Sequence, residues 1–244
     1  HADRRRFDVR FVALGSRGRI AAEIESAGCP VIALGARPGV RPALAFRLAR
    51  LFHDQRIDIV HTHNTKPLLY AGPAARLAQA RGVVHTRHGQ RHGATPRQGL
   101  LFRLAARCAD RIVCVSEDSR RLCGFEGVDP SSIRRIWNGI DRNRFRYTGP
   151  CVRGTALFVG RLSPEKDVAT LLRATAIVVG SHPSFRLQIA GAGPCRAELG
   201  ALAGSLSLGD HVEFIGDVSD VPGLLGRASL FVLPSVTEGL PLTV

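Results

Sequence analysis

The sequence predicts an α/β protein made of two Rossmann-like domains with parallel sheets. Short apolar runs alternate with amphipathic stretches along the whole chain. Strands that alternate with helices of about 10 to 16 residues indicate parallel sheets covered on both faces. The pattern restarts after Gly149-Pro150, beside an Arg-rich stretch, which is typical of a linker. We therefore expect one domain over residues 1–150 and a second over residues 151–244.

Hydrophobic spacing defines the elements of the first domain. Apolar residues three or four positions apart indicate a helix, and short unbroken apolar runs indicate a strand. Leu44, Leu48 and Phe52 have the helical spacing, and Gly28 is a residue type that ends helices. We expect strands over residues 7–14, 30–35, 57–63, 83–89, 111–116 and 133–141. We expect helices over residues 17–28, 41–55, 65–82, 97–110 and 117–125.

The second domain repeats the alternation. We expect strands over residues 155–160, 184–191, 211–216 and 229–234, and helices over residues 167–182, 194–206 and 220–228. The run from Ser229 to Leu233 is expected to be a buried strand. Both domains are expected to be incomplete, because no strand–Gly-loop–helix unit precedes residue 7 and the second domain stops within a unit.

Positive charge is concentrated in the first domain. Residues 1–150 contain 27 Arg or Lys and 12 Asp or Glu, a net charge of +15, whereas residues 151–244 contain 7 and 8, a net charge of −1. A basic half suits an anionic partner such as a membrane surface, a phosphate-bearing substrate or nucleic acid. An Arg-rich surface that only reflects coding composition is the alternative.

Rare residue types carry further information. The six cysteines form no CxxC pair, which indicates free thiols in a reducing cytoplasm. The chain contains no Met, and we interpret it as a fragment or as a chain whose start has been removed. No apolar run approaches the ~20 residues that cross a bilayer. Lys66 and Lys166 are the only lysines among 34 basic residues. A lysine in this background presents a compact point charge that Arg does not.

Three motifs lie where strands end and helices begin. In VGRLSPEKD, residues 159–167, Gly160 ends a strand and the loop carries Arg161 and Lys166. Two cations beside a helix N-terminus form a cradle for a diphosphate. In AGAGP, residues 190–194, the glycines let backbone approach a phosphate or a sugar. In SVTEGLPL, residues 235–242, Glu238 is suited to accept hydrogen bonds from sugar hydroxyls.

These motifs, in this order, resemble the C-terminal domain of retaining GT-B glycosyltransferases of the family 4 group. That family's pattern runs G-R-L-x-x-E-K-G, G-x-G-P, F-x-G and P-S-x-x-E-G-F-P. The matching positions are Gly160, Arg161, Leu162, Glu165, Lys166, Gly191, Gly193, Pro194, Phe214, Gly216, Ser235, Glu238, Gly239 and Pro241. Asp167 replaces the usual Gly, and Leu240 the usual Phe. Residues 57–66, 83–89, 109–117 and 136–145 look like the family's first-domain motifs, so the resemblance covers nearly the whole chain.

The resemblance implies a role for each matching residue. Arg161 and Lys166 would bind the donor's diphosphate and stabilise the departing nucleotide. Glu238, with the amides of Gly239 and Leu240, would hold donor-sugar hydroxyls. His88 would lie near the reacting sugar and the phosphate. Further donor contacts are expected at Gly160, Gly191, Gly193 and Val218; packing is an equal alternative for Val218.

Other polar and aromatic residues have a structural interpretation. His61, His63 and His85 are expected to pack in strands or loops, because no set of Asp, Glu or Cys completes a metal site around them. Asn138-Gly139 is expected to be a turn. Trp137 is expected to pack in the core rather than to form a stacking platform.

Missing motifs narrow the function. The sequence has no Asp-x-Asp, so cations and a helix dipole are expected to replace a metal ion, and no cofactor is expected. It has no G-x-G-x-x-G at a strand–helix junction, which disfavours a dinucleotide dehydrogenase. A GT-B-fold nucleotide-sugar epimerase stays an alternative, although it needs further acid–base carboxylates. An Arg-rich nucleic-acid-binding protein is a second alternative, but interleaved aromatics and recognised modules are lacking.

The leading hypothesis is therefore a glycosyltransferase of surface polysaccharide or glycolipid synthesis. Its expected partners are a nucleotide-sugar donor, a saccharide or lipid-linked acceptor and anionic inner-membrane lipid, and no nucleic acid. The expected location is the cytoplasm, with peripheral attachment to the inner face of the membrane. In the family a second glutamate contacts the donor ribose; the spacing puts it at position 246, so the 244-residue piece alone is expected to be inactive and poorly stable.

Overall fold

The computed structural model describes residues 3–18, 20–37, 39, 41–89, 95–146, 154–238 and 240–241. Its contacts divide the chain into two compact units. The first comprises His1–Arg87, Thr95–Val113 and Cys123–Arg134, and the second His88–Ala94, Cys114–Leu122 and Arg135–Val244. The domain boundary expected at residue 150 lies outside the described residues and stays a prediction.

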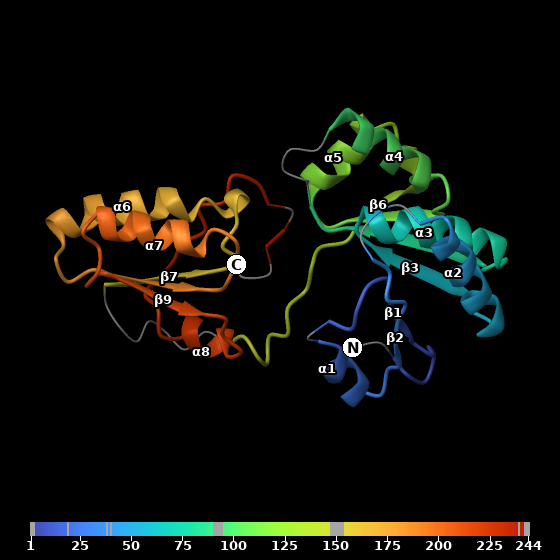
Figure 1. Ribbon diagram of the computed structural model, residues 1–244, viewed down its shortest axis with the longest axis horizontal. Helices are drawn as coiled ribbons and strands as arrows, with labels where there is room; N and C mark the ends of the chain where they lie inside the picture. Colours follow the sequence, from blue (N-terminus) through green and yellow to red (C-terminus); the bar gives the residue numbers. More distant parts are fainter. Residues whose placement is uncertain are drawn as a thin grey trace. The chain divides into compact units, whose positions relative to one another are not determined.

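Helices and short strands alternate through the first 135 residues (Figure 1). The strands are β1 (Phe11–Ala13), β2 (Val31–Ala33), β3 (Ile59–His63), β4 (Gly82–Arg87), β5 (Arg111–Cys114) and β6 (Ile133–Arg135). The helices are α1 (Ala21–Ser26), α2 (Ala43–Asp54), α3 (Thr65–Leu77), α4 (Pro96–Ala106) and α5 (Glu117–Phe125), with a 3₁₀ turn η1 (Pro130–Ser132). Strands β1 and β2 form a parallel pair, and a separate sheet has the order β3-β4-β5-β6.

The remaining residues form a second α/β layer structure. Its strands are β7 (Thr155–Val159), β8 (Arg186–Ala190), β9 (Val212–Gly216) and β10 (Leu230–Phe231). Its helices are α6 (Val168–Ser181), α7 (Arg196–Ser205) and α8 (Val221–Leu225), preceded by a 3₁₀ turn η2 (Pro164–Lys166). The sheet order is β10-β7-β8-β9, and every pairing in it is parallel.

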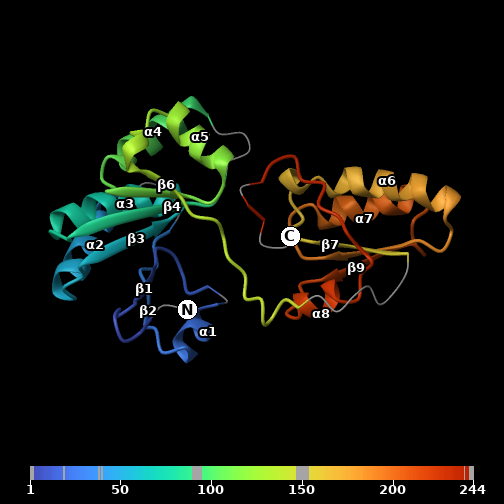
Figure 2. The ribbon, with the colours of Figure 1, turned by 180° about the vertical axis from the view of Figure 1, so that it is seen from behind.

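Alternation along β7 builds two cores, one on each face of this sheet. Ala156 and Phe158 pack with buried residues of α6 and α7, whereas Leu157 and Val159 pack toward side chains of α8. Figure 1 shows α6 and α7 along one face and α8 on the other, and Figure 2 shows the same layers from behind. This is the arrangement that period-2 alternation in a parallel sheet requires.

Every expected strand and helix has a counterpart, and the predicted α/β fold with parallel sheets is confirmed. The buried strand expected over residues 229–233 is wrong in extent and in burial. Strand β10 contains only two paired residues, and Leu230 is 52% exposed. The reason is its position, because β10 pairs only with β7 at the edge of the described sheet. Within the described residues no helix has the length and apolar character needed to span a bilayer.

Candidate functional site

The strand order of the second sheet reverses between β7 and β10. The chain runs from β7 through β8 to β9 in one direction and then returns by α8 to the other side of β7. Ligands of open parallel sheets bind outside the carboxyl ends of strands at such a reversal. Arg161 and Lys166 follow β7, and Glu238 follows β10. The fold therefore brings the first and third sequence motifs together at this edge.

Lys166 and Glu238 are in direct contact. The Lys166 Nζ donates to Glu238 Oε1, and the two side chains are only 19% and 25% exposed. A second bond fastens the same loop to η2, because the Val236 N–H donates to the Glu165 carbonyl oxygen at 3.0 Å. The ammonium and the carboxylate, which sequence reasoning assigned to different parts of one ligand, thus form an ion pair here.

The charged residues around Lys166 differ in their environment. Arg161 is exposed, and its guanidinium is accessible to an anion. The pKa of the Glu165 carboxyl is lowered, first by the hydrogen bond from the Ser163 hydroxyl at 2.7 Å, then by backbone hydrogen bonding and the positive charges of Arg161 and Lys166. Glu165 is consequently held ionised beside the two cations.

Two glycines after β8 are required by packing. A Cβ atom on Gly191 would lie 1.9 Å from the Gly160 carbonyl oxygen, and one on Gly193 would lie 2.2 Å from that of Leu162. Gly191 also has φ +130°, which disfavours any other residue. The loops after β7 and β8 therefore touch through their backbones, a reason for these glycines that holds whether or not a ligand approaches.

Asp167, one of the two departures from the family pattern, has a local explanation. It lies in the left-handed region, with φ +45° and ψ +43°, where Gly is the default and Asp is tolerated. Its carboxylate accepts a hydrogen bond from the Thr170 N–H and caps α6. The aspartate thus lacks the conformational freedom of glycine, but its side chain caps the helix.

Residues at the end of β9 and just after it serve the packing of the sheet. Val218 is half-buried and packs against the core that contains Leu157, Val159 and Ala190. Gly216 has φ +72°, and its carbonyl oxygen accepts a hydrogen bond from the Gly191 N–H at 2.7 Å. The packing interpretation of Val218 accounts for this geometry, and its contact with a donor base stays a prediction.

Four histidines lie within or directly after β3 and β4. His85 is fully buried, as expected of a packing residue, and shares a 2.9 Å hydrogen bond with the Thr62 hydroxyl. His61 and His63 are exposed, and their ring centres lie 4.4 Å apart. His88 directly follows β4 and is exposed; its role beside the reacting sugar stays a prediction.

Two residues outside the predicted donor contacts, Asn138 and Ser235, lie against or within the loop that carries Glu238. Asn138, expected only as a turn residue, donates its side-chain amide to the Leu240 carbonyl oxygen at 3.0 Å. The Ser235 hydroxyl is buried without a hydrogen-bond partner among the described residues. The core position expected for Trp137 is wrong: its side chain is 54% exposed, and Arg135 lies 4.7 Å from its ring centre. Gly239 lies outside the described residues, so its predicted amide contact has no structural description.

The sequence profile of Glycosyltransferase Family 4 matches residues 1–144, more than half of the chain. The chain belongs to this family. The profile of glycosyl transferases group 1 matches residues 141–244 of the same family 4 chain. Both matches agree with the family named from the ordered motifs, and that recognition is confirmed.

Two curated relatives of this family 4 chain are named as glycosyltransferases with lipid-linked acceptors. It is 31% identical over 222 residues to the UDP-Gal:alpha-D-GlcNAc-diphosphoundecaprenol alpha-1,3-galactosyltransferase of Escherichia coli, an alignment that covers 81% of this chain and 57% of the relative. It is 28% identical over 219 residues to the GDP-mannose-dependent alpha-(1-6)-phosphatidylinositol monomannoside mannosyltransferase of Mycolicibacterium smegmatis, covering 83% and 57%. The chain thus spans little more than half the length of these relatives.

A solved structure supports the architecture. Anabaena HepE in complex with UDP and glucose superposes on this family 4 chain with a TM-score of 0.81 and 21% identity. The match covers 92% of this chain and 66% of the HepE chain. At this identity the likeness concerns the fold, and it agrees with two Rossmann-like domains.

Proposed function

We propose that this chain carries the donor site of a glycosyltransferase that uses a nucleotide-diphosphate sugar. The main support is the meeting of Lys166 with Glu238 at the strand-order reversal between β7 and β10. A nucleotide-diphosphate sugar needs a cation for its diphosphate and a hydrogen-bond acceptor for its sugar hydroxyls. The two groups must lie close enough for one ligand to reach both. Arg161 follows the same strand and adds a planar fork of donors for phosphate oxygens.

Each residue has a distinct role in this proposal. Arg161 and Lys166 bind the diphosphate, and their charges stabilise the nucleotide as it departs. Glu238 takes hydroxyl groups of the donor sugar together with the amides of Gly239 and Leu240. His88 lies beside the reacting sugar. Backbone at Gly160, Gly191 and Gly193 borders the ligand, Val218 contacts its base, and no metal ion takes part.

The proposed reaction retains anomeric configuration by displacement on one face of the sugar. The acceptor oxygen forms a bond to the anomeric carbon as the bond from that carbon to the phosphate oxygen breaks. The acceptor proton passes to the leaving phosphate, and the products are a glycoside and a nucleoside diphosphate. Positive charge from Arg161 and Lys166 lowers the barrier by meeting the charge that develops on the leaving oxygen.

The proposed acceptor is a saccharide or a lipid-linked saccharide of surface polysaccharide or glycolipid synthesis. Both curated relatives described above are named for acceptors that carry a lipid and a phosphate. The net charge of +15 over residues 1–150 suits such an acceptor and an anionic membrane surface. We accordingly propose a cytoplasmic protein attached peripherally to the inner face of the cell membrane.

Nucleotide-sugar binding tests the donor site. Calorimetry on the full-length protein with UDP-galactose and GDP-mannose is expected to find one saturable donor. Arg161→Ala or Lys166→Ala is expected to weaken nucleoside diphosphate binding by about tenfold or more and to abolish transfer, because each removes a charge-assisted contact of ~1.5 kcal/mol or more. Arg173→Ala, an exposed arginine on α6, is the matched control and should bind normally. Unchanged binding in both site variants would rule out the assignment.

A further inference from the structure

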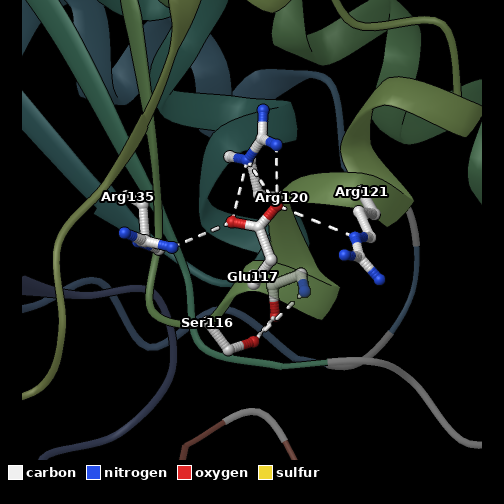
Figure 3. A network of polar contacts seen from close by, with 6 residues as sticks. Ser116, Glu117, Arg120, Arg121 and Arg135 are labelled. Carbon is white, nitrogen blue, oxygen red and sulfur yellow. Dashed lines mark hydrogen bonds and ion pairs between the residues drawn. The ribbon is translucent and has the colours of Figure 1, made fainter.

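Three arginines converge on one carboxylate at the start of α5. Arg120 donates its Nε and one Nη to Glu117 at 2.6 to 3.0 Å, and Arg135 donates its Nη1 at 3.1 Å. Arg121 approaches with its Nε at 3.7 Å. Figure 3 shows all three guanidinium groups turned toward Glu117. We call these four residues the Glu117 cluster.

The Glu117 cluster has an excess of positive charge. Arg120 holds the carboxyl ionised, because its hydrogen bond lowers the pKa of Glu117. One carboxylate therefore faces three guanidinium ions, which leaves the cluster two charges positive. Asp118, the next residue, is exposed and forms no ion pair with these arginines among the described residues.

Most hydrogen-bond donors of the cluster are not used by Glu117. A guanidinium has five N–H donors. Arg135 gives one of them to the carboxylate, and Arg121 makes only the long 3.7 Å approach. The side chains of Arg121 and Arg135 are 67% and 43% exposed, so solvent reaches both of them. A surface with exposed guanidinium groups and excess positive charge is suited to the oxygens of a phosphate.

An exposed aromatic ring fixes one of these arginines. The Arg135 guanidinium lies 4.7 Å from the ring centre of Trp137, which itself is 54% exposed. A stacked guanidinium keeps its N–H edge available while the ring restricts its motion. Because less side-chain freedom is then lost on binding, Arg135 is held ready for an anion. An exposed tryptophan beneath it has no role in stabilising the core.

We propose that the Glu117 cluster is a binding site for a phosphate or diphosphate ester. The anion takes N–H groups of Arg121 and Arg135, and Glu117 keeps Arg120 in place. The ligand is the phosphate-bearing part of an acceptor, an identity that depends on the proposed function. The phosphate chemistry does not depend on it, because none of these residues belongs to the proposed donor site.

The competing explanation is that the cluster is a purely structural network. Replacing Glu117 distinguishes this explanation from phosphate binding. If the cluster only joins α5 to the chain around β6, removing the carboxylate lowers stability and gives no gain in anion binding. If the cluster binds phosphate, Glu117→Gln removes a competing negative charge and strengthens binding. Arg121→Ala and Arg135→Ala must then act in the opposite direction, because each removes donors and charge.

The experiment is calorimetry with inorganic pyrophosphate on protein that carries Arg161→Ala and Lys166→Ala, so that the donor site is disabled. Saturable binding is expected to persist. Arg121→Ala and Arg135→Ala are each expected to weaken it about fivefold, the upper range for a charge pair exposed to solvent, and Glu117→Gln is expected to tighten it. Arg107→Ala, an exposed arginine at the end of α4, is the matched control. Thermal unfolding of each variant verifies folding.

The outcomes are distinct. No pyrophosphate binding without the donor cations, or equal binding by all cluster variants, overturns the inference. Pyrophosphate binding that follows the expected pattern in a protein that binds no nucleotide sugar refutes the proposed function and leaves the phosphate site standing. The last experiment measures binding of each variant to vesicles of phosphatidylcholine with and without phosphatidylglycerol. If Arg121→Ala and Arg135→Ala reduce only vesicle binding, the cluster is a lipid-docking surface and the phosphate-ester proposal is wrong.

Discussion

Lys166 and Glu238 form a partly buried ion pair although 72 positions separate them in the chain. The pair joins η2, which follows β7, to the loop that follows β10. If Lys166 binds the donor's diphosphate, that ligand must compete with Glu238 for the ammonium. The carboxylate that is proposed to hold the sugar therefore also weakens the binding of a diphosphate that carries no sugar.

The first prediction concerns this competition. Glu238→Gln is expected to tighten the binding of a free nucleoside diphosphate about fivefold, since a pair of this exposure contributes ~1 kcal/mol. The gain should be smaller for the nucleotide sugar, because the amide is a poorer acceptor for hydroxyl groups than the carboxylate. Calorimetry with UDP and GDP, each with and without a sugar, measures both effects.

Glu198→Gln, at an exposed position on α7, is the control and should change neither affinity. Weaker binding of the free diphosphate by Glu238→Gln would contradict the competition. That result would mean that Glu238 positions the Lys166 ammonium for the phosphate and does not compete with the phosphate for it.

The second prediction concerns the glycines between β8 and α7. Gly193→Ala is expected to destabilise the protein by about 1 to 3 kcal/mol, because the new Cβ atom would meet the Leu162 carbonyl 2.2 Å away. Gly204→Ala is the control, and it is expected to change the stability in the opposite direction. Gly204 lies within α7 with open space around it, so alanine there should stabilise by roughly 0.5 to 1 kcal/mol.

Urea denaturation of both variants measures the difference. Nucleotide affinity of Gly193→Ala should fall as well, since the loop that carries Arg161 and Lys166 must move to relieve the clash. Equal stability of the two variants would show that the backbone contact between the loops is not tight in solution.

Periodicity predicted the elements because most of them bury one regular face. Helix α5 has the bounds expected from the sequence, and α6 differs by one residue at each end. Strands were predicted too long, since a residue counts as a strand only where a neighbouring strand supplies hydrogen bonds. Strand β10 shows the effect most clearly, because its apolar run extends beyond the part that pairs with β7.

Contacts between distant residues could not be predicted in the same way. Sequence motifs named Lys166 and Glu238 but assigned them to separate parts of a ligand, and only the strand order brings them together. The Glu117 cluster depends on Arg135, which the fold brings from β6 to the start of α5. Trp137 was expected in the core because large aromatic residues usually are buried, and one residue type alone carries no information about its neighbours.

The last prediction concerns how Asp110 makes the stability of the protein depend on pH. Asp110 accepts hydrogen bonds from Arg76 of α3 at 2.7 Å and from the Val83 N–H of β4 at 2.7 Å. These bonds, the Arg76 one first, lower the pKa of the Asp110 carboxyl in the folded protein. A lowered folded pKa stabilises the protein above the unfolded pKa of about 3.9, and the contribution is lost as pH falls through the folded value.

Asp110→Asn is therefore expected to be less stable than the wild type at pH 7, and the difference should shrink as pH falls from about 4 toward the lowered folded pKa. Urea midpoints compared at pH 7, 5, 4 and 3 measure it. Asp210→Asn, at an exposed position before β9 without a side-chain hydrogen bond among the described residues, should stay close to the wild type throughout. A gap between Asp110→Asn and the wild type that is constant with pH would show that shape, rather than charge, links Asp110 to α3 and β4.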